Sequence, residues 1–294
     1  MVTMALSIIF DKGCNPMPVS RWIKMAFHRL INQFYSRWPQ PIPARKRFED
    51  VHIISHRGEH DNLSLIENTI PAFDRVRDEG VWGIELDIQW TLDHQPVVFH
   101  DTTGRRLFDS EAEIRLLSLS ELQTDFPLIP SLEEVIDRYG GSLHLMIELK
   151  KETFPDSPRH IRQLKDLLSP LSPQRDYHLL SLNEPLFDRI DFLPSQTFIP
   201  IAELNFRHLS AVALRKHYGG ITGHYLFLNN TLLQTHHRQG QQTGTGFIES
   251  ENCLYREINR GVDWVFTNQA VKLQRIWEKK RVADGNFAEA SLKN

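Results

Sequence analysis

Short apolar runs recur along residues 51–267, and between them lie stretches in which apolar positions repeat every three or four residues. The short runs predict buried β-strands, and the longer repeat predicts amphipathic helices. The predicted strands are Val51–Ser55, Gly83–Ile88, Val97–Phe99, Leu143–Leu149, Tyr177–Leu182, Thr197–Ala202, His224–Leu228, Thr245–Ile248 and Trp264–Thr267. The predicted helices are Glu67–Glu79, Ser131–Tyr139, Ile161–Leu168, Glu184–Ile190 and Leu254–Asn259.

Strands that alternate with helices over this length predict a parallel α/β architecture, and closure into a TIM (β/α)₈ barrel fits the length. Nine runs are one more than such a barrel needs. The gap between Gly83–Ile88 and Val97–Phe99 is too short for a crossover helix, so these two runs are expected to form an irregular pair.

A different pattern precedes the first run. Between Pro18 and Pro39, apolar and aromatic residues line one face of a predicted helix, while the other face carries cations and no acids. This pattern is typical of a helix in a membrane interface beside anionic lipid. A helix docked on its own domain or on a dimer partner fits equally well. Residues 40–47 are predicted to be a linker stiffened by proline.

The net charge of −3 is divided unevenly along the 294 residues. Residues 1–47 carry eight Lys or Arg and one acid, a net charge of +7, which leaves −10 on the remainder. An acidic body argues against a nucleic-acid partner and suggests that the basic segment meets any anionic surface. The predicted organisation is therefore a basic N-terminal arm over residues 1–47, a barrel over 48–278 and a frayed tail over 279–294.

The two cysteines, Cys14 and Cys253, form no disulfide or zinc-binding pattern, so a reducing compartment is expected. No apolar run approaches the roughly 20 residues of a membrane-spanning helix. We expect a cytoplasmic protein that can associate with the cytoplasmic face of a membrane.

Ionisable residues occur within or at the ends of the predicted strands. Glu85 and Asp87 share one face of their strand, as do Glu148 and Lys150, because side chains at i and i+2 point the same way. If these strands form a barrel, their ionisable groups converge at one mouth. Three carboxylates gathered there would repel one another unless a cation offset their charge.

The oxygen-rich set of Glu85, Asp87 and Glu148 suits a hard divalent ion such as Mg²⁺ or Ca²⁺. Two histidines at strand ends, His56 and His100, suit proton transfer at neutral pH. Two cations, Arg57 and Lys150, suit phosphate oxygens. Each of these groups of residues alone is a weak signal of function. The stronger signal is the order in which the groups occur along the chain.

These residues occur in motifs that resemble those of the glycerophosphodiester phosphodiesterase family. The similarity covers about residues 51–270. The matching motifs, in order, are His56-Arg57-Gly58, Glu67-Asn68-Thr69, Gly83-Ile84-Glu85-Leu86-Asp87, Pro96-Val97-Val98-Phe99-His100-Asp101, Ile129-Pro130-Ser131-Leu132-Glu133-Glu134-Val135, Ile147-Glu148-Leu149-Lys150, Ser181-Leu182 and Gly261-Val262-Asp263.

The resemblance implies a TIM barrel and a divalent-metal phosphodiesterase. It implies that one Mg²⁺ or Ca²⁺ is held by the carboxylate set, that the two histidines act as general acid and base, and that Arg57 binds phosphate with Lys150 beside it. Glu67 would orient these groups. The implied reaction begins with attack by the glycerol 2-hydroxyl of the substrate, passes through a cyclic phosphate and ends with its opening by water.

Three departures from the family pattern place the shape of the substrate pocket in question. The stretch from Thr102 to Leu128 is short and carries Arg105-Arg106, Gly246-Phe247-Ile248 stands where Trp-Thr is usual, and Thr267-Asn268 stands where Thr-Asp is usual.

Three functions fit the sequence. The leading one is hydrolysis of a small glycerophosphodiester to an alcohol and glycerol 3-phosphate. The second is hydrolysis of a lysophospholipid by the same machinery at a membrane surface, with residues 18–38 contacting anionic lipid. The third is a barrel that binds a phosphodiester without turnover.

Overall fold

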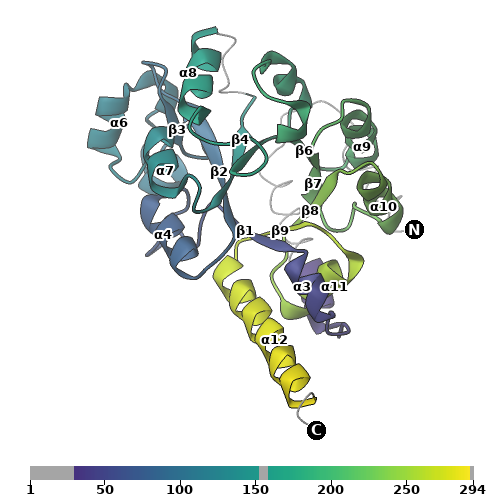
Figure 1. Ribbon diagram of the computed structural model, residues 1–294. Coiled ribbons are helices and arrows are strands. Elements are labelled where there is room, and N and C mark those ends of the chain that lie inside the picture. Colours follow the sequence, from purple (N-terminus) through teal and green to yellow (C-terminus); the bar gives the residue numbers. More distant parts are fainter. Residues whose placement is uncertain (1–29, 152–157, 292–294) are drawn as a thin grey trace.

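Eight parallel strands close into a barrel in this computed structural model, which describes residues 30–151 and 158–291. The strand order is β1-β9-β8-β7-β6-β5-β4-β2, and β1 pairs with β2 to close the ring, while β3 extends β2 as an antiparallel edge (Figure 1). The strands are β1 (His52–His56), β2 (Gly83–Trp90), β3 (Pro96–Val98), β4 (His144–Leu149), β5 (Tyr177–Ser181), β6 (Phe198–Ala202), β7 (Gly220–His224), β8 (Gln242–Gly246) and β9 (Trp264–Thr267).

Helices surround the barrel, as the parallel connections require (Figure 1). The α-helices are α3 (Arg45–Glu49), α4 (Ile70–Asp78), α5 (Arg105–Phe108), α6 (Leu119–Asp125), α7 (Leu132–Tyr139), α8 (Pro158–Leu168), α9 (Phe206–Arg215), α10 (Asn230–Arg238), α11 (Glu251–Arg260) and α12 (Ala270–Ser291). Short 3₁₀ helices are η1 (Ile114–Leu116), η2 (Glu184–Arg189) and η3 (Ser195–Thr197). The TIM-barrel prediction is confirmed.

The alternation of side chains along each strand builds two apolar cores. In β4, Leu145, Ile147 and Leu149 point outward and pack beneath the helices, whereas Met146 points inward. The inner core is a small group at mid-barrel, formed by Ile54, Met146, Leu180, Ile199, Trp264 and Phe266. This apolar layer closes the barrel below the strand ends, so charged side chains gather at the mouth above it.

The predicted irregular pair is an antiparallel pairing in which Ile88 opposes Val98. The prediction of a strand at His224–Leu228 was wrong, because β7 ends at His224. The prediction at Thr245–Ile248 began three residues late. Both strands are rich in glycine, so their sequences lack the apolar run that predicts a strand. Glycine is required at Gly220 because a Cβ there would collide with the carbonyl of Gln242.

Helix predictions were right for α4, α7, α8 and α11 and failed elsewhere. Helices α9 and α10 were missed, and the predicted helix at Glu184–Ile190 is the 3₁₀ helix η2. The expected tail boundary at residue 278 falls inside α12, which continues to Ser291. The expected linker over residues 40–47 is also partly wrong, because α3 begins at Arg45.

An insertion between β3 and α7 carries α5, η1 and α6 and has its own apolar core. This core is built from Val97, Phe99, Ile114, Leu122, Phe126 and Ile129. It is a cluster separate from those that fill the barrel and its helical layer, so the insertion is packed internally as well as against the strands.

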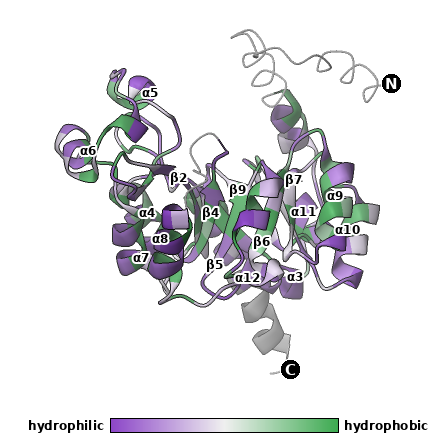
Figure 2. Cartoon of the chain, turned by 90° about the horizontal axis from the view of Figure 1, so that it is seen from above, coloured by the Kyte–Doolittle hydropathy of each residue, from purple (hydrophilic) through white to green (hydrophobic). Residues whose placement is uncertain are grey.

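Residues 30–37 are helical and dock on the barrel, while residues 18–29 of the predicted helix lie outside the described residues. The Tyr225 hydroxyl donates to Asn32 Oδ1 at 2.8 Å, and Tyr35 packs edge-on against Tyr225. Figure 2 shows this helix beside β7 and α11. Its other side leaves Phe34 57% and Trp38 58% exposed. Within the described residues, no helix is long and apolar enough to cross a membrane.

Candidate active site

Three carboxylates meet at the carboxyl ends of neighbouring strands. Asp87 of β2 lies directly opposite Glu148 of β4, and Glu85 lies opposite His56 of β1. One oxygen from each of Glu85, Asp87 and Glu148 lies within 4.8 Å of the others, and all three side chains are buried. The convergence predicted from the i, i+2 pattern is therefore present.

Burial and mutual repulsion set the charge state of this carboxylate cluster. Burial, followed by the charges of Asp87 and Glu148, raises the pKa of Glu85 well above its ordinary value. Burial and Asp87 likewise raise the pKa of Glu148. Burial also opposes ionisation of Asp87, but Arg57 and Lys150 outweigh it and lower its pKa. Asp87 is thus the anionic centre of the cluster.

The two predicted phosphate-binding cations lie against these acids. Arg57 Nε is 3.0 Å from Asp87 Oδ2, and Arg57 Nη1 is 2.9 Å from Glu67 Oε1. Lys150 Nζ is 2.5 Å from Asp87 Oδ1 and 2.6 Å from Glu148 Oε1. Their side chains keep 15% and 12% exposure, so both cations border the mouth as well as the cluster.

Both predicted proton-transfer residues are at the mouth, and each is 32% exposed. His56 Nδ1 is 2.6 Å from Asn268 Oδ1, and His100 Nδ1 is 2.7 Å from Asp101 Oδ1. Because both partners are oxygen acceptors, each Nδ1 carries a proton and donates it, which leaves each Nε2 as the reactive nitrogen. Burial, then the neighbouring Arg57, lowers the pKa of His56 below its ordinary value.

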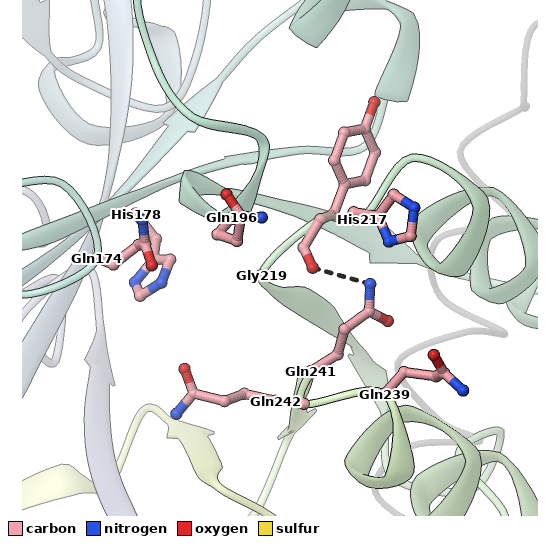
Figure 3. A pocket seen from close by; sticks show the side chains of 10 residues that line it. Gln174, His178, Gln196, His217, Gly219, Gln239, Gln241 and Gln242 are labelled. Atoms are coloured by element: carbon pink, nitrogen blue, oxygen red, sulfur yellow. Dashed lines mark hydrogen bonds between the residues drawn. The ribbon is translucent and has the colours of Figure 1, made fainter.

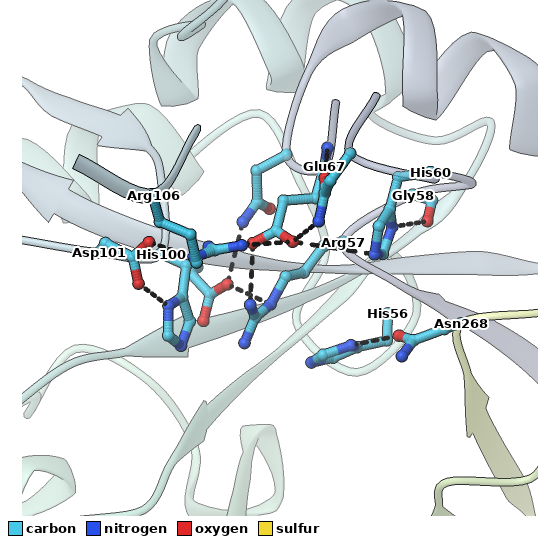
Figure 4. Close-up of polar contacts among 12 residues, drawn as sticks. His56, Arg57, Gly58, His60, Glu67, His100, Asp101, Arg106 and Asn268 are labelled. Carbon is cyan, nitrogen blue, oxygen red and sulfur yellow. Dashed lines mark hydrogen bonds and ion pairs between the residues drawn. The ribbon is translucent and has the colours of Figure 1, made fainter. Parts of the chain in front are cut away.

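Asn268 belongs to a set of supporting residues to which the sequence analysis assigned no role. It replaces the usual aspartate of the family pattern and contacts His56, so this departure reaches the reaction site as well as the pocket. Asn68 Nδ2 donates to Asp87 Oδ2 at 3.0 Å. Asp101 and Arg106 complete the set (Figure 4). Asn68 and Asp101 lie in the quoted motifs, whereas Arg106 and Asn268 lie at departures from the family pattern. The partners of all four depend on the fold.

Glu67 joins these supporting residues to the cations. Its carboxylate, 4% exposed, accepts hydrogen bonds from Arg57, Arg106 and Asn62. Burial alone would raise its pKa, but these bonds hold the pKa of Glu67 below its ordinary value. This geometry fits the orienting role implied by the family resemblance.

The opposite half of the mouth carries three exposed apolar residues. Leu182 follows β5 and is 50% exposed, Leu204 follows β6 and is 50% exposed, and Phe247 follows β8 and is 46% exposed. Phe247 lies 5.3 Å from the ring of His224 at the end of β7. The mouth is therefore divided between a charged half on β1, β2 and β4 and an apolar half on β5, β6 and β8.

A second hollow, of about 170 Å³, lies at the other end of the barrel, where β5, β7 and β8 begin (Figure 3). It is lined by Gln174, His178, Gln196, His217, Tyr218, Gly219, Gln239, Gly240, Gln241 and Gln242. Among the described residues, no acid, lysine or arginine lines this hollow, so these residues lack the charges that a phosphate or a hard cation needs.

The carboxylate cluster has the chemistry of a divalent-cation site. Glu85 Oε2 is buried and has no hydrogen-bond partner among the described residues. A cation at this point would bind that oxygen and remove the repulsion that raises the pKa of Glu85 and Glu148. Three carboxylates without nitrogen or sulfur ligands suit Mg²⁺ or Ca²⁺.

Comparison with known proteins finds similarity to one enzyme family. The model of the glycerophosphoryl diester phosphodiesterase family matches residues 56–182, which include every predicted site residue. Over these residues the chain is similar to this family. A glycerophosphodiester phosphodiesterase of Caldanaerobacter subterraneus is 37% identical over 110 residues, 33% of this chain and 44% of the relative. The matched segments span less than half of such curated relatives.

Solved structures of similar proteins have the same fold. A glycerophosphodiester phosphodiesterase of Thermotoga maritima aligns over 77% of this chain and 98% of its own, with a TM-score of 0.65 and 19% identity. An Oleispira antarctica phosphodiesterase, solved with the product sn-glycerol-3-phosphate, aligns over 78% and 98%, with a TM-score of 0.63 and 23% identity. At these identities the likeness establishes the barrel fold.

Adding Mg²⁺ or Ca²⁺ is expected to raise the melting temperature of the protein, because the ion offsets repulsion in the folded state. Saturation at about 100 times Kd adds about 2.7 kcal/mol, or several degrees for a chain of this size. Glu148→Gln should lose most of the shift. Glu133→Gln, on the exposed face of α7, is the control and should keep it. Equal shifts in both variants would contradict the site.

Proposed function

We propose that this protein hydrolyses glycerophosphodiesters to an alcohol and glycerol 3-phosphate. The observation that carries the proposal is the pair of imidazoles at the mouth, His56 and His100, each with Nδ1 fixed and Nε2 left for proton transfer, beside a buried carboxylate cluster. The match of residues 56–182 to the glycerophosphoryl diester phosphodiesterase family supports the same reaction class.

Glu85, Asp87 and Glu148 are proposed to hold one Mg²⁺ or Ca²⁺, which would stabilise negative charge on the phosphoryl oxygens. Arg57 is proposed to bind phosphate through its remaining guanidinium nitrogen, because Nε and Nη1 are already committed to Asp87 and Glu67. Lys150 contributes a second positive charge beside the same oxygens.

The partners of the two histidines suggest which acts first as base. Burial and the neighbouring Arg57 lower the pKa of His56 although its bond to neutral Asn268 opposes them, so His56 is suited to begin as the unprotonated base. The carboxylate of Asp101 does stabilise an imidazolium, so His100 is suited to begin as the acid.

His56 would take the proton of the glycerol 2-hydroxyl as its oxygen attacks phosphorus. His100 would give a proton to the departing alcohol as the bond from phosphorus to that alcohol breaks, leaving a cyclic phosphate. In the second half the roles reverse: His100 takes a proton from water as it attacks phosphorus, and His56 returns a proton to the 2-oxygen as the ring opens. Both histidines then regain their initial states.

His56→Ala and His100→Ala are each expected to lower kcat on glycerophosphocholine by ~10²-fold or more, because each removes one proton-transfer group. Release of glycerol 3-phosphate is the measurement, with and without EDTA. His208→Ala, on the exposed face of α9, is the matched control. Near-wild-type turnover in either site variant would remove the assigned role. No turnover by folded wild-type protein would favour a non-catalytic binding barrel.

The apolar half of the mouth favours a second substrate class, the lysophospholipids. A small glycerophosphodiester offers little apolar surface to Leu182, Leu204 and Phe247, whereas an acyl chain would cover all three. The reaction at phosphorus is unchanged in this alternative, and only the group attached to glycerol differs.

If acyl chains bind this half, Leu182→Gln should lower the ratio of kcat/KM for lysophosphatidylcholine to that for glycerophosphocholine. Loss of one partly buried leucine contact, about 1.5 kcal/mol, corresponds to roughly tenfold. Leu92→Gln is the control, because Leu92 is 57% exposed but lies in the β2–β3 loop. An unchanged ratio, or no hydrolysis of the lysophospholipid, would exclude this substrate.

We also propose peripheral contact with an anionic membrane through residues 18–38, and hence a cytoplasmic protein that associates with the cytoplasmic face. In the described part, Leu30, Phe34 and Trp38 recur every fourth residue and are 57–68% exposed although the opposite side of the helix is docked. Arg37 on the same helix, and the +7 charge of residues 1–47, complement anionic lipid.

The double variant Phe34→Ser and Trp38→Ser is expected to weaken binding to phosphatidylserine-containing vesicles at least tenfold, because it removes most of the exposed apolar stripe. Turnover of soluble substrate should not change. Leu116→Ser, 53% exposed on η1, is the control. Vesicle co-sedimentation measures the effect. Undiminished binding by the double variant would exclude this stripe as the contact.

A further inference from the structure

Arg106 connects two loops of the active site through a single guanidinium group. Its Nε is 2.6 Å from Asp101 Oδ2, its Nη2 is 2.6 Å from Glu67 Oε1, and its Nη1 is 3.1 Å from Glu67 Oε2 (Figure 4). Asp101 follows β3 and Glu67 follows β1. One planar side chain therefore fixes two carboxylates that come from different parts of the barrel rim.

Each of these carboxylates in turn positions a residue assigned to the reaction. Asp101 accepts the Nδ1 proton of His100 through its other oxygen, so Arg106 and His100 share one carboxylate. Glu67 accepts from Arg57 Nη1 through the same oxygen that receives Arg106 Nη2. The chain of contacts thus runs from the imidazole to the phosphate-binding cation by way of Arg106.

The position of Arg106 is set by the insertion. The next residues on α5, Leu107 and Phe108, pack against the core of the insertion, and the Phe108 ring lies 5.9 Å from Phe99 and 5.3 Å from Phe126. Helix α5 is therefore held in place independently of the ion pairs. A guanidinium on a fixed helix can hold mobile carboxylates in one orientation, which a freely moving side chain cannot.

We propose that Arg106 is a positioning residue that sets the orientations of His100 and Arg57 together, acting through Asp101 and Glu67. The inference rests on the proposed phosphodiester hydrolysis, in which those two residues give a proton and bind phosphate. It makes the insertion part of the active site, since the packing of α5 determines where the guanidinium lies.

The simpler alternative is that Arg106 only stabilises the fold through its ion pairs. The neighbouring Arg105 provides an example of such an ion pair. Arg105 lies on the same helix, is 75% exposed and pairs with Glu111, itself 73% exposed. Arg106 is 30% exposed and makes a two-nitrogen contact with a carboxylate that is 4% exposed. Exposed pairs of the first kind contribute little, whereas loss of Arg106 would remove one of two arginines from a buried acid.

Arg106→Met and Arg105→Met form a matched pair that removes the same charge from the same helix. Arg106→Met is expected to lower kcat on glycerophosphocholine at least tenfold through His100 and to raise KM several-fold through Arg57. Arg105→Met should stay within twofold in both constants. Equal effects of the two variants, with the wild type active, would overturn the inference. An inactive but folded wild type would instead overturn the proposed function.

Two further measurements separate positioning from loss of folding. Arg106→Lys keeps the positive charge but cannot contact both carboxylates in the same way, so it should keep its melting temperature within a few degrees and still lose at least fivefold in kcat. Asp101→Asn should add little to the kcat loss of Arg106→Met if both act through His100. A fully active lysine variant, or kcat losses that multiply, would contradict the proposed path.

The ring nitrogens of His100 give a readout that does not depend on turnover. In the wild type, Nδ1 should carry the proton that it donates to Asp101, and nitrogen NMR of the labelled protein detects this state. Arg106→Met should change the His100 nitrogen signals while leaving those of exposed His208 unaltered. Unchanged His100 signals in the variant would show that Arg106 does not position this imidazole.

Discussion

The electrostatic repulsion among three carboxylates, buried side by side at the barrel mouth, is the constraint on which the rest of the site depends. Glu85, Asp87 and Glu148 would each be costly to bury as anions, and together they repel one another. Arg57 and Lys150 lie against Asp87 and offset part of this charge. The surplus over these two cations is what makes the cluster suitable for a divalent ion.

The order of the strands in the barrel places the two cations beside the three carboxylates that they offset. Adjacent strands β1, β2 and β4 bring the acids and both cations to one side, while exposed Leu182, Leu204 and Phe247 follow β5, β6 and β8. A phosphodiester has a charged centre and substituents of variable polarity, so a divided mouth offers a separate environment for each part. The boundary between the two halves is where a substrate would be oriented and where specificity would be decided.

Two segments outside the eight-stranded barrel, the insertion after β3 and the N-terminal helix, add further residues to it. The insertion after β3 supplies Arg106 from its own packed core and ties His100 to the opposite loop. The N-terminal helix docks beside β7 and α11 with one side and leaves a row of apolar residues exposed on the other. Docked and interfacial roles, which the sequence left as alternatives, are therefore compatible in one helix.

The sequence by itself determined the barrel and the grouping of Glu85, Asp87 and Glu148, because both follow from local patterns. Apolar runs mark the strands, and the i, i+2 spacing places Glu85 and Asp87 on one face wherever their strand lies. The bounds of β7 and β8 were not predicted correctly, because both strands need glycine for close backbone contact and therefore lack an apolar run. The links from Asn268 to His56 and from Arg106 to Glu67 join residues 212 and 39 positions apart. Only the tertiary structure could decide these pairings, because barrel closure and the packing of the insertion bring those side chains together.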